Sequence, residues 1–211
     1  MVPQIRRNCA MKVLLHICCG PCAIVPVETL RGLGHEVTGF FLNPNIHPAS
    51  EYLRRREAAQ EVARRLGLPM LWRDAYDLPA WLQRLSGRER NGPKHPKPRC
   101  ALCYAQRLEA TAEEAALKAD AFTSSLLYSR FQLHDRIAAI GETAAQLHNI
   151  PFFYHDFRTG WQRGIDLSKD WGLYRQTYCG CIFSEQERFK SALKKLETPT
   201  GRAVDSEKCE E

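Results

Sequence analysis

Short apolar runs alternate with longer amphipathic stretches along most of this 211-residue chain. A short apolar run with branched side chains is typical of a strand that is buried on both faces. Apolar positions three or four residues apart predict a helix with one face on a core. We therefore expect strands at 11–17, 35–42, 69–73, 121–127 and 151–157, and helices at 23–33, 50–66, 79–85, 100–118, 131–148 and 182–196.

This order of elements predicts an α/β fold, with a mostly parallel sheet and helices on both of its faces. We expect a single domain at 11–196, a flexible leader at 1–10 and a polar tail at 197–211. Residues 87–99 are rich in glycine, proline and basic side chains, which predicts a loop. The segment 158–178 shows no clear period, and we expect it to be irregular.

Local signals refine the expected helices. Ser50 is a plausible N-cap of the helix at 50–66. Pro21 fits the first position of the helix that follows it in the chain. Three consecutive arginines, Arg54, Arg55 and Arg56, predict an exposed helix face, because runs of charge are usually solvated.

The composition is that of an ordinary globular protein, with 44% hydrophobic and 26% charged residues. No apolar run approaches the roughly 20 residues that span a bilayer. The apolar run before the first cysteines is short and lacks a small-residue cleavage site, so it does not resemble a secretory signal. These features predict a cytoplasmic protein without a membrane partner. The net charge of +6 permits a nucleic-acid partner but does not demonstrate one.

The cysteines carry the strongest chemical signal. Two of the nine, Cys9 and Cys209, lie in polar terminal segments. The other seven form three groups: Cys18-Cys19-x-x-Cys22, Cys100-x-x-Cys103 and Cys179-x-Cys181. A framework of disulfides is more typical of short secreted chains, so the grouping favours metal or redox chemistry.

Each group has a local reason to present its thiols together. Adjacent cysteines on a strand point to opposite faces, and Cys18 and Cys19 converge only if the following Gly-Pro sequence turns the chain. The alternative is that one of this pair only packs in the core. The spacing of Cys100 and Cys103 puts both on one face near the start of a helix, where the dipole favours thiolates. Gly180 lets the chain pass close to a cofactor.

Seven thiols exceed the needs of one site. A zinc ion or a 4Fe–4S cluster takes four, and the remaining three fit a second metal with an open position, or a redox pair. This excess favours a catalytic site over a purely structural one. The basic stretch from Arg84 to Arg107 could bind a phosphate backbone or could be a solvated loop.

The sequence resembles the cobalamin-independent epoxyqueuosine reductases of the QueH type. The resemblance covers nearly everything from Met11 to about Lys195. The segments that carry it include LLHICCGPC at 14–22, FLNPNIHP at 41–48, RCALCYAQRLEATA at 99–112 and LYRQTYCGCIFSE at 173–185. In this family, the position of Cys22 also accepts aspartate.

The resemblance implies reduction of the epoxide of epoxyqueuosine to queuosine at the wobble base of certain tRNAs. It also implies a HUP-like fold related to ATP-pyrophosphatase-like domains, a 4Fe–4S cluster and an additional mononuclear iron. We expect all seven internal cysteines to bind metal. Those expected to bind the cluster are Cys18, Cys19, Cys100, Cys103, Cys179 and Cys181, and Cys22 is the candidate for the second iron.

On this interpretation, the second iron polarises the epoxide as a Lewis acid, and a ferredoxin or flavodoxin supplies electrons through the cluster. Asp156 and Tyr178 are candidate proton donors. The candidates for tRNA or base contacts are Arg99, Tyr104, Arg107, Arg158, Lys169, Tyr174 and Arg175. Two other classes stay open: a tRNA sulfur-transfer enzyme on a related fold, and a non-catalytic zinc module that binds RNA.

Overall fold

Four parallel strands form the centre of the protein in a computed structural model that describes residues 10–86 and 98–197. They are β1 (Lys12–His16), β2 (Glu36–Phe41), β3 (Met70–Trp72) and β4 (Ala121–Ser124), and they lie in the order β3-β2-β1-β4. Each neighbouring pair is parallel. The interior position of β1 explains its apolar sequence, because helices cover both faces of the sheet.

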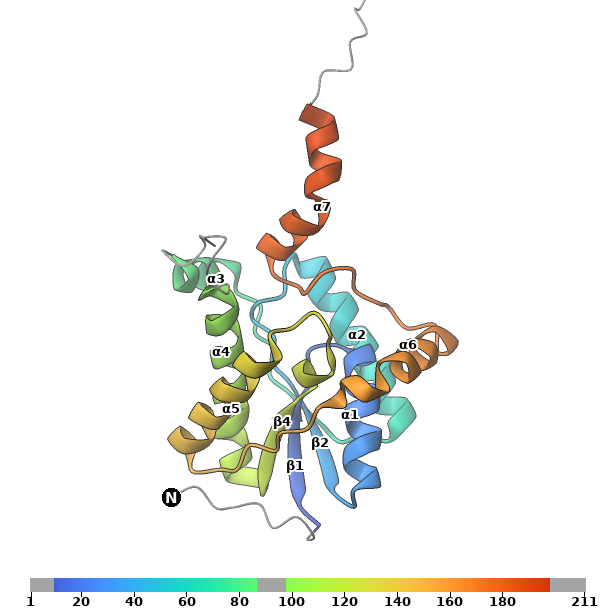
Figure 1. Cartoon of the computed structure of the whole chain (residues 1–211), viewed down its shortest axis with the longest axis vertical. Coiled ribbons are helices and arrows are strands. Elements are labelled where there is room, and N and C mark those ends of the chain that lie inside the picture. Colours follow the sequence, from blue (N-terminus) through green and yellow to red (C-terminus); the bar gives the residue numbers. More distant parts are fainter. Residues whose placement is uncertain (1–9, 87–97, 198–211) are drawn as a thin grey trace, which may run out of the picture.

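Figure 1 shows α4 and α5 on one side of the sheet and α1, α2 and α6 on the other. The helices are α1 (Gly20–Gly32), α2 (Ala49–Leu66), α3 (Leu78–Leu85), α4 (Pro98–Lys118), α5 (His134–His148), α6 (Trp161–Asp170) and α7 (Ile182–Glu197). Short 3-10 helices lie at Ser125–Tyr128 (η1) and Phe157–Gly160 (η2). The predicted parallel sheet with helices on both faces is confirmed.

Several expected elements differ in the structure. The strand expected at 151–157 is only an isolated bridge between Phe122 and Phe152. The strand expected at 121–127 ends at Ser124, whose side chain accepts from the Leu126 backbone and starts η1. Part of the segment expected to be irregular, 158–178, forms α6, where Gly164 packs closely against Tyr128.

The start of α2 also differs from the expectation. Ser50 is not its N-cap, because the helix begins at Ala49 and follows Pro48 in extended geometry. Pro21 occupies the first turn of α1, as expected, with Gly20 before it. A side chain at Gly20 would collide with the backbone, because its Cβ would lie 2.2 Å from the Ala58 oxygen. This close approach fixes the start of α1 against α2.

Some expectations fall outside the described residues: most of the leader, the centre of the basic loop, the tail beyond 197, and both terminal cysteines. Within the described part of the chain, no helix has the length and apolar character needed to cross a membrane.

Candidate metal centre

The candidate site lies at the carboxyl edge of the sheet. Cys18 and Cys19 follow β1, Ser125 follows β4, and the loop 43–48 follows β2. In open parallel sheets, ligands bind at this edge, because the loops that follow neighbouring strands meet there. All seven internal cysteines, which lie within the described residues, retain their thiols rather than form disulfides.

Three of these cysteines form a compact group. The sulfur atoms of Cys18, Cys19 and Cys22 all lie within 4.8 Å of one another, and all three residues are buried. The turn into α1 directly after Cys19 brings the adjacent pair to the same place. The alternative that one of the pair only packs in the core is therefore not supported. We call these residues the three-thiol group.

Each sulfur of the three-thiol group has a polar side chain beside it. Ser125 donates from its hydroxyl to Cys18 over 3.3 Å, and the Cys18 backbone donates to the same hydroxyl over 3.0 Å. The Gln176 amide donates to Cys19 over 2.9 Å and also lies 3.5 Å from the sulfur of Cys22.

The thiols of the group also influence one another. Hydrogen bonds from Cys19 and Cys22 hold the pKa of Cys18 well below its ordinary value, whereas burial raises the pKa of Cys19. Cys18 is thus the most acidic thiol of the group, because the neighbouring thiols and burial also raise the pKa of Cys22. A bound metal ion is the ordinary way to stabilise further thiolates in so small a space.

The other four cysteines line one cavity. Cys100 and Cys103 come from the first turns of α4, and Cys179 and Cys181 come from the irregular segment between α6 and α7. We call the segment 173–181 the strap, and the cavity the four-thiol cavity. The side chains that complete its lining are Asn45, Trp81, Arg99, Tyr104, Arg107 and Gln132.

Arg107 contributes a buried positive charge to the four-thiol cavity. Its Nη2 atom donates to the sulfur of Cys103 over 2.9 Å, and its Nε atom donates to the Cys103 carbonyl over 3.1 Å. Burial raises the pKa of the Cys103 thiol to about 12, although the charge of Arg107 opposes this shift. Arg107 therefore lies beside a cysteine of the four-thiol cavity, and its expected contact with tRNA stays a prediction.

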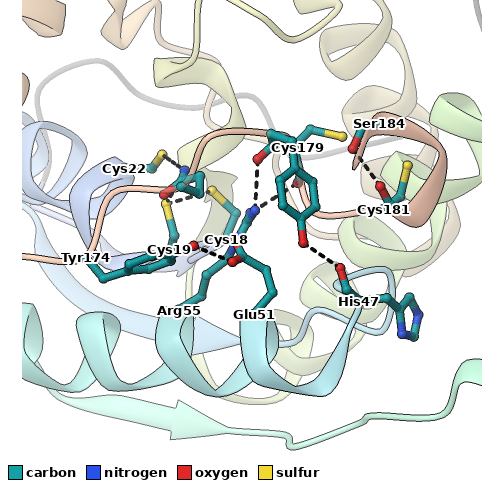
Figure 2. Close-up of polar contacts among 12 residues, drawn as sticks. Cys18, Cys19, Cys22, His47, Glu51, Arg55, Tyr174, Cys179, Cys181 and Ser184 are labelled. Atoms are coloured by element: carbon teal, nitrogen blue, oxygen red, sulfur yellow. Dashed lines mark hydrogen bonds and ion pairs between the residues drawn. The ribbon is translucent and has the colours of Figure 1, made fainter. Parts of the chain in front are cut away.

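A second buried arginine, Arg55, holds the strap. It donates to the carbonyl oxygens of Tyr178 and Cys179 over 2.8 and 3.1 Å, and its Nε atom pairs with Glu51 at 2.6 Å. Figure 2 shows Arg55 reaching from α2 to the strap, near the three-thiol group. The prediction of an exposed face is wrong for Arg55, which is only 1% exposed. The preceding Arg54 does lie at the surface.

The loop after β2 completes the support of the strap. The Tyr178 hydroxyl donates to the His47 carbonyl over 2.8 Å, and the His47 backbone donates to the Gly180 carbonyl over 2.8 Å. Gly180 has φ of +114°, a conformation that side chains disfavour, and a Cβ there would crowd Arg55 and Ile46. The glycine between the two strap cysteines is thus required by the backbone.

Comparison with known proteins shows the family of the chain. A family model described as epoxyqueuosine reductase QueH matches residues 13–187. The chain belongs to the epoxyqueuosine reductase QueH family.

Relatives with this description include proteins from Thermotoga maritima, Haemophilus influenzae and Dehalococcoides mccartyi. The Thermotoga protein is 36% identical over 181 residues, which cover 83% of this chain and 91% of the relative. The Haemophilus protein is 37% identical over 183 residues, which cover 85% of this chain and 74% of the relative. The Dehalococcoides protein is 33% identical over 181 residues, which cover 85% of this chain and 96% of the relative.

A solved structure shows the same fold. It is described as a predicted subunit of tRNA methyltransferase from Methanocaldococcus jannaschii, and it superposes with a TM-score of 0.51. The match covers 89% of this chain and 88% of that one at 14% identity, so it concerns the fold alone. Together with the parallel sheet, it confirms the expected HUP-like class.

The two predicted proton donors of this chain, Asp156 and Tyr178, have different surroundings. Asp156 makes a two-point ion pair with Arg158, at 2.8 and 2.6 Å, and this pairing lowers the pKa of Asp156 to about 2. A carboxylate held in this way is ionised at neutral pH, so the structure does not favour a donor role for it. Tyr178 lies one residue from Cys179, and burial raises the pKa of its hydroxyl.

The remaining predicted substrate contacts are dispersed. Tyr104 is buried at the four-thiol cavity, with its hydroxyl on Gln132 at 2.7 Å. The hydroxyl of Tyr174 bonds to Glu51. Lys169 and Arg175 are exposed, and their predicted contacts with tRNA stay predictions. Arg99 also lines the cavity and pairs with Glu187 at 2.5 Å.

Sequence reasoning did not single out Gln176 or assign a role to Arg55. Gln176 lies in a run of aromatic and basic residues, and nothing in its local pattern indicates a contact with cysteines more than 150 positions earlier. Asn45 was not singled out either, and it is buried and lines the four-thiol cavity.

Proposed function

We propose that this protein reduces the epoxide of epoxyqueuosine in tRNA to queuosine, using iron held by its seven internal cysteines. Membership of the QueH family supports the reaction. The observation that carries the cofactor proposal is the division of the thiols: four line one cavity and three form a separate group.

The donor set fits the proposed metals. Four thiols are what a 4Fe–4S cluster takes, so Cys100, Cys103, Cys179 and Cys181 would hold the cluster. A three-thiol site leaves a coordination position for a substrate oxygen or water, so Cys18, Cys19 and Cys22 would hold the additional iron. This assignment differs from the sequence expectation, which placed Cys18 and Cys19 on the cluster. When bound, these groups would supply electrons and an electrophile for the epoxide oxygen.

The protein's own residues supply a buried and positively charged setting. Arg107 faces the four-thiol cavity, and Arg55 holds the strap near both sets of thiols. Both guanidinium groups are buried, where a charge acts more strongly than in water. They would offset the negative charge of thiolate ligands, because opposite charges nearby favour the ionised form of a thiol.

The reaction consumes two electrons and two protons, breaks both carbon–oxygen bonds of the epoxide and releases water. The final protons need a donor near the reacting oxygen. Tyr178 remains a candidate because it adjoins Cys179, although its hydroxyl bonds to the His47 carbonyl in this state. Replacing Tyr178 with Phe should slow turnover if it donates, and Asp156→Asn should leave the rate unchanged.

The proposed partners follow from the reaction. The substrate is a queuosine-type tRNA, which implies a cytoplasmic protein, and a ferredoxin or flavodoxin would supply electrons. We propose that Lys169 and Arg175 contact the tRNA. Both are exposed, and the negative phosphate backbone attracts basic side chains. Their contribution should weaken as salt increases.

The deciding experiment combines spectroscopy, metal analysis and turnover. Protein purified without oxygen should be brown, should contain about five iron atoms per chain, and should reduce an epoxyqueuosine-containing anticodon stem-loop. A colourless protein with zinc alone would support the zinc module instead. Transfer of sulfur to the tRNA without epoxide reduction would support the sulfur-transfer alternative.

A further inference from the structure

Gln176 presents the donor end of its side chain to two sulfurs of the three-thiol group. Its Nε2 atom lies 2.9 Å from the sulfur of Cys19 and 3.5 Å from that of Cys22. A thiolate sulfur can only accept a hydrogen bond, and only the nitrogen of an amide can donate one. This orientation of Gln176 therefore suits sulfurs that are ionised, as they are when they bind a metal ion.

The three-thiol group has hydrogen-bond donors on two sides. Ser125, which follows β4, donates to Cys18, and Gln176, from the strap, reaches Cys19 and Cys22. Each of the three sulfurs thus has a polar donor nearby, and the two donors come from separate parts of the chain. This distribution is expected for a site whose sulfurs carry negative charge, because hydrogen bonds to thiolates are charge-assisted.

The strap holds Gln176 in place from both directions. Before it, the Tyr174 hydroxyl bonds to Glu51. After it, Arg55 holds the strap by donating to the carbonyl oxygens of Tyr178 and Cys179 over 2.8 and 3.1 Å. Glu51 and Arg55 also bond to each other, so one buried pair on α2 fixes the strap on either side of Gln176.

We propose that Gln176 is a positioning residue that stabilises a metal ion in the three-thiol group by donating to its sulfur ligands. The inference rests on the proposed function only for the identity of the metal. If Gln176 has this role, retention of the ion depends on the position of the strap. The strap also supplies Cys179 and Cys181 to the four-thiol cavity. Removing such an outer donor typically weakens metal binding 10- to 100-fold.

The test uses Gln176→Leu, which keeps approximate size but has no donor, in holoprotein purified without oxygen. Iron release to an excess of a coloured chelator is followed while visible absorption reports the cluster. We expect one iron per chain to leave about 10- to 100-fold faster than in the parent protein, with the absorption unchanged. Gln162→Leu is the matched control, since Gln162 is an exposed glutamine on α6 whose amide donates to nearby Asp166.

A second variant tests whether the position of the donor matters. Gln176→Asn keeps the amide but shortens its reach, and it should also release iron faster than the control. Melting temperatures identify any variant that fails to fold. Release at the parent rate in both variants would overturn the proposal, as would loss of the cluster absorption together with the labile iron. If the parent protein holds zinc, zinc release tests Gln176 equally, although the proposed reductase would then have failed.

Discussion

The Nη2 atom of Arg107 donates to the sulfur of Cys103 over 2.9 Å, within the four-thiol cavity. Arg107 is buried, so its charge acts on this sulfur with little screening. A positive charge beside a cluster favours the reduced state, because reduction adds negative charge.

We therefore expect Arg107→Met to lower the reduction potential of the bound cluster. A unit charge about 8 Å away at an effective dielectric of about 20 contributes about 2 kcal/mol, or on the order of 100 mV for one electron. Redox titration followed by visible absorption measures the shift. Arg163→Met is the control, because Arg163 pairs with Glu28 at the surface. Equal potentials in both variants would contradict the role of Arg107.

The two sets of thiols should respond differently to substitution. Cys22→Ala removes a ligand from the three-thiol group, so it should lower iron by about one atom per chain, retain the visible absorption and abolish epoxide reduction. Cys103→Ser should instead bleach the cluster. Cys22→Asp should retain some turnover, because a carboxylate is a good iron ligand. Metal analysis, absorption and turnover are measured on the same anaerobic samples. Loss of the absorption in every cysteine variant would argue against separate sites.

The buried pair of Arg55 and Glu51 should matter more to stability than exposed pairs. Arg55→Met leaves the Glu51 carboxylate buried without its cation, which typically costs about 3 kcal/mol or more in the free energy of unfolding. Adding Glu51→Gln should recover part of that loss. Arg64→Met, in an exposed pair with Glu61, should change the free energy of unfolding far less, because water screens that pair.

Urea denaturation of the metal-free variants measures these differences. A cost for Arg55→Met no larger than that for Arg64→Met would show that the buried pair and its bonds to the strap contribute little.

Two glycines of α1 offer a matched comparison. A side chain at Gly20 would meet the backbone of α2, so Gly20→Ala should destabilise the protein by about 2 kcal/mol or more. Gly32 has nothing within 4 Å of the position a Cβ would occupy, so Gly32→Ala should be neutral or slightly stabilising. Thermal unfolding distinguishes the two, and similar melting temperatures would contradict the close packing at Gly20.

Local patterns predicted much of the fold. The apolar run of β1, the turn at Gly20 and Pro21, and the periodic apolar positions of α2 and α4 each specify structure within a short stretch of chain. Errors arose where distant contacts decide the outcome. The polar sequence of α6 has only a partial apolar face, and its packing on α1 could not be read from that stretch alone.

The site shows the same limit. The spacing of the cysteines indicated metal chemistry, but how the thiols divide depends on where the strap lies. Arg55 stands in a run that resembles a solvated face, yet its carbonyl partners come more than 120 positions later. Asp156 could not be recognised as the partner of Arg158 without its conformation.

The position of the strap late in the chain has a consequence for biosynthesis. The three-thiol group is encoded within a single turn near the amino end, and its cysteines leave the ribosome together. The four-thiol cavity requires Cys100 and Cys103 to meet Cys179 and Cys181, which emerge after nearly all of the sheet and its covering helices. The four-thiol cavity can therefore form only on an almost finished polypeptide, and a chain truncated before the strap would lack two of its four thiols.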